Sequence, residues 1–71
     1  MKVKKENDKI VGFLELLDGS RVDLSYDESS SIVLIDFENH ISRMSLKEFK
    51  EFVKALETYI KYIENYRKID I

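Results

Sequence analysis

The sequence predicts an α+β fold, in which an antiparallel β-sheet of three or four strands (a meander) is followed by one long C-terminal α-helix. Residues 10–37 hold short apolar segments separated by polar turn sequences, of which Asp18-Gly19 is the clearest. Residues 45–48, Ser-Leu-Lys-Glu, form a helix-starting sequence, and no glycine or proline follows it. With 71 residues and no cysteine, the chain is expected to form one small domain without disulfide bonds.

The composition is typical of a folded domain. It is 44% apolar, with four phenylalanines and four tyrosines. Residues 1–9 carry four lysines and two acidic residues, and we expect them to form a charged N-terminal segment, able to be flexible, ahead of a sheet-plus-helix domain at residues 10–71. No apolar run approaches the roughly 20 residues of a membrane-spanning helix. We therefore expect a soluble, cytoplasmic protein that does not bind membranes.

The first two strands are expected on either side of Asp18-Gly19. This pair favours a two-residue type I′ turn, because both of its positions require positive φ. With that loop, Phe13 faces Leu24 across the hairpin. The predicted core face holds Val11, Phe13, Leu17, Val22, Leu24 and Tyr26. The predicted second face holds Ile10, Leu14 and Leu16 opposite Arg21, Asp23 and Asp27.

A third strand is expected at residues 32–37. Val33, Ile35 and Phe37 alternate with Ile32 and Leu34, and apolar residues on both sides are typical of a strand that is covered twice. Residues 38–44 leave two alternatives. They turn into a short fourth strand around residues 41–44, or they continue one long bent strand.

The helix is expected to begin after Ser45 and to continue to about residue 68. Ser45 and Glu48 form a capping box, in which each side chain accepts a hydrogen bond from the backbone of the other. The apolar residues then recur at alternating spacings of three and four, which is a heptad pattern. This stripe consists of Phe49, Phe52, Leu56, Tyr59, Ile63 and Tyr66, widened by Val53 and Ile60. Lysines recur every seven residues on the opposite side, at Lys47, Lys54, Lys61 and Lys68.

The lengths of these elements predict self-association. A helix of about 23 residues is roughly 35 Å long, whereas a six-residue strand spans roughly 20 Å. The second half of the helix therefore overhangs the sheet, and a second copy of the chain can cover it, as a homodimer or a higher even-numbered oligomer. The expected interface consists of Phe52, Leu56, Tyr59, Ile60, Ile63 and Tyr66 with Leu14 and Leu16. The alternative is a bent helix, or a curved sheet that encloses both apolar faces.

No residue pattern predicts catalysis, a cofactor or a metal site. His40 is the single histidine, close in sequence to Asp36 and Glu38, but a metal site needs three or four converging ligands. Residues 29–31 are serines without a partner base, and neither glycine belongs to a phosphate-binding motif. The sequence therefore predicts a non-catalytic interaction module, an adaptor or accessory protein. It is expected to bind further copies of itself, and it can also bind another protein.

The order of strands followed by a helix, with the junction ISRMSLKEFKEF at residues 41–52, resembles the transcriptional-coactivator/Whirly type of single-stranded-DNA-binding fold. The likeness covers most of residues 10–68. It implies a dimer whose curved sheet binds single-stranded nucleic acid through basic and aromatic side chains. Residues 10–44 depart from this pattern, because they hold seven acidic residues and two basic ones. Nucleic-acid binding is therefore the alternative function, through Lys4, Lys5, Arg21, Arg43, Lys47, Lys54 and Lys61.

Overall fold

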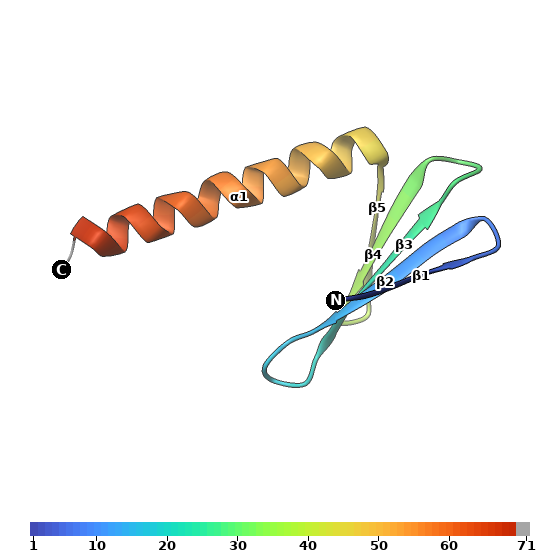
Figure 1. Ribbon diagram of the computed structural model, residues 1–71, viewed down its shortest axis with the longest axis horizontal. Coiled ribbons are helices and arrows are strands. Elements are labelled where there is room, and N and C mark those ends of the chain that lie inside the picture. The colour runs from blue at the N-terminus through green and yellow to red at the C-terminus, as the bar shows by residue number, and fades with distance from the viewer. Residues whose placement is uncertain (70–71) are drawn as a thin grey trace.

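The computed structural model describes residues 1–69, with side chains up to Tyr66. The elements are β1 (Lys2–Glu6), β2 (Lys9–Glu15), β3 (Arg21–Asp27), β4 (Ile32–Phe37), β5 (His40–Ser45) and α1 (Leu46–Ile69). The strands form one antiparallel sheet in the order β1-β2-β3-β4-β5, so each strand pairs with its sequence neighbour (Figure 1). The predicted α+β meander with a C-terminal helix is confirmed, with five strands rather than three or four.

The additional strand is β1, at residues expected to precede the sheet. It pairs with β2, with Val3 opposite Gly12. A Cβ atom on Gly12 would lie 2.9 Å from the Cε atom of Met1 and 3.1 Å from the backbone oxygen of Lys2. The glycine therefore allows the N-terminal strand to approach β2 closely. The expectation that residues 1–9 lie outside the sheet is therefore wrong, because residues 2–6 form β1. The lysines that made β1 hard to recognise in the sequence are typical of an edge strand.

The turn between β2 and β3 also differs from the predicted one. The Leu16 N–H donates to the backbone oxygen of Ser20 at 2.8 Å, and the Gly19 N–H donates to that of Leu16 at 3.0 Å. Gly19 has a φ of 90°, so the loop is a turn of three residues that ends in a left-handed glycine. A third loop residue moves the pairing by one position, and Phe13 faces Asp23 rather than Leu24.

The shifted register changes which side chains share a face, because neighbouring residues of a strand point to opposite sides. Val11 and Phe13 leave the predicted core face, Ile10 and Leu14 join it, and Leu17 lies in the turn. The apolar face comprises Val3, Lys5, Ile10, Gly12, Leu14, Val22, Leu24, Tyr26, Val33, Ile35, Phe37, His40, Ser42 and Met44. The charged face comprises Lys2, Lys4, Glu6, Lys9, Val11, Phe13, Glu15, Arg21, Asp23, Ser25, Asp27, Ile32, Leu34, Asp36, Ile41, Arg43 and Ser45.

The choice left open at residues 38–44 is decided in favour of a separate strand. Glu38 and Asn39 have φ values of 53° and 64°, and Phe37 pairs with His40 across them. Two consecutive left-handed residues between paired strands form a tight hairpin turn. Residues 40–45 are therefore a distinct strand, β5, rather than the end of one long bent strand.

The predicted capping box at the start of α1 is confirmed. The Ser45 N–H donates to Glu48 Oε1 at 3.0 Å, and the Glu48 N–H donates to Ser45 Oγ at 3.1 Å. The hydrogen bond from the Ser45 backbone lowers the pKa of the Glu48 carboxyl group. The Leu46 N–H also donates to the backbone oxygen of Ser31 at 3.2 Å. Because β5 ends at Ser45 and α1 begins at the next residue, no linker separates them.

The helix and the sheet pack against each other only near this junction. Helix α1 contacts β4 and β5 and otherwise extends away from the strands (Figure 1). Among the described residues Val33 is the only buried hydrophobic one, at 4% exposure. The chain exposes 6355 Å², whereas a compact protein of its 8.4 kDa mass exposes about 4,600 Å². Its radius of gyration is 14.9 Å, against about 11 Å for a compact chain of this length.

Candidate functional site

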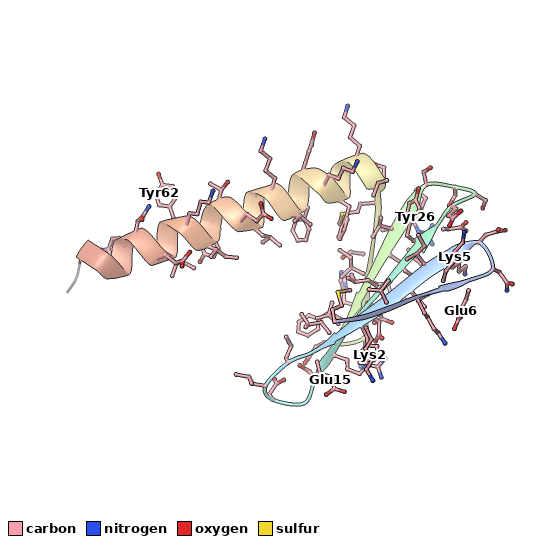
Figure 2. All side chains as sticks on the ribbon, viewed as in Figure 1. Lys2, Lys5, Glu6, Glu15, Tyr26 and Tyr62 are labelled. Atoms are coloured by element: carbon pink, nitrogen blue, oxygen red, sulfur yellow. The ribbon has the colours of Figure 1, made fainter. Side chains whose placement is uncertain are left out.

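The apolar stripe of α1 is the first exposed surface with a candidate function. All six helix residues of the predicted interface remain exposed, with fractions from 41% to 68%: Phe52, Leu56, Tyr59, Ile60, Ile63 and Tyr66. Tyr62 lies outside the heptad positions, and Figure 2 shows its side chain on the side of α1 that faces away from the strands. The stripe therefore continues well beyond the part of the helix that touches the sheet.

The apolar face of the sheet is the second such surface, and it looks toward the same side as the helix. A cavity of about 170 Å³ lies where the first turn of α1 meets this face, lined in part by Tyr26, Val33 and Phe49. Farther from the junction the face is open, and Leu14 is 45% exposed. Leu16, also predicted at the interface, lies just beyond the end of β2 in the turn. The predicted helix residues, Leu14 and Leu16 are thus all exposed within one copy.

The charged face carries side-chain pairs along single strands. The Lys4 Nζ atom lies 2.6 Å from Glu6 Oε1, and the hydrogen bond to Glu6 raises the pKa of Lys4. Arg21 Nη2 lies 2.7 Å from Asp23 Oδ1, and the Arg21 guanidinium lies 4.1 Å from the centre of the Phe13 ring. These pairs lie in a water-exposed surface, where solvent and salt screen them, so they add little to stability.

The charged face also contains a cleft of about 840 Å³. Val11, Phe13 and Leu34 contribute apolar lining, and Lys2 and Asp36 contribute opposite charges. Figure 2 shows Lys2 and Glu15 close to the same end of the sheet. An open cleft with an apolar centre and charged borders can hold an extended polar chain whose side groups or bases are planar or apolar.

The face with this cleft is not acidic, contrary to the charge balance of residues 10–44. Because β1 belongs to the sheet and β2 begins at Lys9, the charged face holds five basic and five acidic residues. Several of the other carboxylates lie in turns. Asp18 accepts hydrogen bonds from the Ser20 hydroxyl and backbone N–H groups, which lower its pKa. The negative charge counted along the sequence is therefore not concentrated on one surface.

The residues predicted for nucleic-acid binding do not form one cluster. Lys4, Arg21 and Arg43 lie on the charged face, but Lys5 lies on the apolar face, with its Nζ atom 3.2 Å from Glu28 Oε1. Three others lie on α1, at Lys47, Lys54 and Lys61, and the side chain of Lys68 lies outside the described residues.

The sequence-based alternative of nucleic-acid binding left out two members of the charged face that share it with Lys4 and Arg21, namely Lys9 and Phe13. A signal for β1, the strand that carries Lys2 and Lys4, was present. The alternation Lys2-Val3-Lys4 is the period of a half-buried strand.

The residues considered as metal ligands do not converge. His40 and Asp36 belong to opposite faces of the sheet, and Glu38 is in the turn between β4 and β5. Within residues 1–69 no three histidine, cysteine or acidic side chains are grouped so that they could hold a metal ion. Over the same range, α1 lacks the continuous apolar length that would let a helix cross a bilayer.

Comparison of the chain with protein-family models, curated proteins and solved structures gave no match. The resemblance to the transcriptional-coactivator/Whirly type therefore stays a prediction. A function for this chain has to be argued from the two faces of the sheet and from α1.

Proposed function

We propose that this protein is a non-catalytic interaction module, an adaptor or accessory protein, that acts as a homodimer joined through α1 and the apolar face. The observation that carries the proposal is that the described residues of one copy enclose almost no interior. Val33 is the only buried hydrophobic residue among those described. A sheet with one apolar face is stable in water when another element covers that face.

The excess surface has the size of a dimer interface. One copy exposes about 1,700 Å² more than a compact protein of its mass. If two copies bury this area, the interface totals about 3,400 Å², which is within the range of obligate homodimers. Such a dimer leaves the charged face free, and its cleft then provides the surface for a further partner.

The test is the mass of the particle in solution. Multi-angle light scattering across a concentration series is expected to give about twice the mass of one 8.4 kDa chain. Leu56→Asp on the apolar stripe should give the single-chain mass or an unfolded chain. Tyr62→Asp is the matched control on the same helix and should keep the dimer. A folded wild-type particle of single-chain mass at high concentration would contradict the proposal.

Binding of single-stranded nucleic acid is a second candidate function, supported by the charged face. Phe13 lines the cleft, Arg21 lies over its ring, and Lys2 and Lys4 border the same cleft. Stacking of bases on aromatic side chains between cationic residues is the usual mode of binding single strands. The equal number of acidic residues on this face weighs against strong binding.

Fluorescence polarisation with labelled oligothymidine at low and high salt tests this candidate. Binding should weaken as salt rises. Phe13→Ala should weaken it about tenfold, the loss expected for one stacked base, whereas Lys54→Ala should have little effect. If Lys54→Ala weakens binding and Phe13→Ala does not, the helix lysines bind the strand instead. Absence of binding at low salt would exclude this function.

A further inference from the structure

We infer that the two copies of the dimer exchange their helices, so that residues 52–66 of each α1 lie across the apolar face of the other subunit. This inference rests on the proposed self-association and specifies how it occurs. Each copy carries one apolar helix stripe and one apolar sheet face that cover each other only near the β5–α1 junction. Reciprocal exchange covers both surfaces with a single two-fold axis.

The helix cannot fold back over its own sheet without being broken. Ser45 is both the end of β5 and the cap of α1, so the direction of the helix is fixed by the direction of the strand. The hydrogen bond from Leu46 to Ser31 fixes the first turn further. Sharp kinks in helices occur mainly at proline or glycine, and residues 46–69 contain neither. The apolar face beyond β4 therefore stays open within one copy.

The two surfaces match in size. Residues 52–66 of a helix span about 21 Å. Five strands at the usual spacing make a sheet about 19 Å wide. One helix segment is thus long enough to cross the partner's sheet from β5 to β1.

The two surfaces also match in chemistry. The stripe residues from Phe52 to Tyr66 carry no formal charge. On the apolar face the only ionisable side chains besides Tyr26 are Lys5 and His40, on the two outermost strands, β1 and β5. Contact between these surfaces therefore leaves no charged group at the centre of the interface, which is the composition of obligate dimers.

Pairing of the two helices alone would not complete the fold. A helix-to-helix contact covers the stripe but leaves the outer part of the apolar face in water, where Val3 is 61% exposed and Leu14 is 45% exposed. Large contiguous apolar patches are rare on the surface of a free monomer. Exchange of the helices covers it, which is why we favour this arrangement over a simple coiled coil.

Cysteine cross-linking tests the arrangement, because the chain has no cysteine of its own. A tagged Leu14→Cys variant is mixed with an untagged Ile63→Cys variant, subunits are allowed to exchange, and a short bismaleimide is added. The expected product is a covalent heterodimer, several-fold more abundant than in two matched controls. In the first control Tyr62→Cys replaces Ile63→Cys on the outer side of the helix. In the second, Ile41→Cys on the charged face replaces Leu14→Cys.

The outcomes separate this inference from the proposed function. If Ile63→Cys cross-links efficiently to a second Ile63→Cys chain but not to Leu14→Cys, the helices pair with each other and the exchange is wrong, although the dimer stands. If light scattering gives a single-chain mass for both unlinked variants and the wild type, self-association itself is wrong. Equal yields with Leu14→Cys and Ile41→Cys would also overturn the exchange.

Discussion

The two faces of the sheet are built from the same five strands and yet differ in their relation to water. On the apolar face, the only ionisable residues besides Tyr26 are Lys5 and His40, while the charged face carries five basic and five acidic residues. Two ion pairs of the charged face, Lys4–Glu6 and Arg21–Asp23, each join residues of a single strand. The apolar face is covered by its own helix only near β4 and β5. This difference is the basis of our proposal that the apolar face serves assembly and the charged face recognition.

The largest expected effect on stability comes from placing an aspartate on either face of the sheet, at neighbouring positions of β4. Val33→Asp should unfold the protein, because a carboxylate at the only buried hydrophobic position among the described residues loses its hydration; the cost is several kcal/mol. Leu34→Asp, on the charged face, should cost about 1 to 2 kcal/mol. Urea unfolding followed by far-UV circular dichroism at one fixed protein concentration measures both. Equal losses from the two variants would remove the distinction between the faces.

Removing the helix cap tests the junction that holds α1 away from its own sheet. Ser45→Ala deletes the hydroxyl that accepts the Glu48 N–H, and loss of such a cap costs about 1 kcal/mol. The unfolding midpoint in urea should fall accordingly, with Ser45→Asp, which can also cap a helix, as the control that keeps most of the stability. If Ser45→Ala is as stable as the wild type, the cap does not anchor the helix.

The turn that sets the register should respond to a smaller change. Gly19 has a φ of 90°, and alanine in this left-handed region is strained by about 1 kcal/mol. Gly19→Ala should therefore lower the free energy of unfolding by about that amount. Gly12→Ala is not an equivalent control, because its added Cβ meets β1. Gly19→Asn is the suitable control, because asparagine tolerates positive φ, and it should lower the free energy of unfolding less than Gly19→Ala does. Unchanged stability in Gly19→Ala would indicate another turn and hence other faces.

Acidic pH should destabilise the junction between β5 and α1, because the Glu48 carboxylate that accepts a hydrogen bond there becomes protonated. Its pKa is lowered in the folded state from the ordinary 4.5, so its contribution is complete above pH 4.5 and is lost as the pH falls through the lower folded value. Asp18 and Asp27 act in the same direction, through hydrogen bonds from Ser20 and Ser29. Glu48→Gln removes one of these titrations, so its stability should fall less steeply between pH 5 and strongly acidic conditions, as measured by thermal unfolding. If stability falls equally steeply with pH in the variant and the wild type, the helix cap does not depend on the charge of Glu48.

Local sequence signals predicted much of the fold and part of the candidate site. The capping residues and the heptad stripe placed α1 and its exposed side, and alternation placed β4. The Asp18-Gly19 signal located a hairpin but not its loop length, because a left-handed glycine suits both a two-residue and a three-residue turn. That one residue moved Phe13 onto the charged face. The lysine-rich β1 was missed, since few of its side chains are apolar, and with it the basic border of the cleft.

The sequence by itself determined the helix with its capping box, the strand at residues 32–37 and the position of the hairpin around Asp18-Gly19, because these choices depend on neighbours within a few residues. Only the tertiary structure decided which side chains share a face, that the helix leaves the sheet after its first turns rather than half-way along, and that Phe13, Arg21, Lys2 and Lys4 border one cleft. The physical reason is that strand register and the angle between helix and sheet depend on a few backbone dihedrals in the turns and at the Ser45 junction. Small changes there move every side chain that follows.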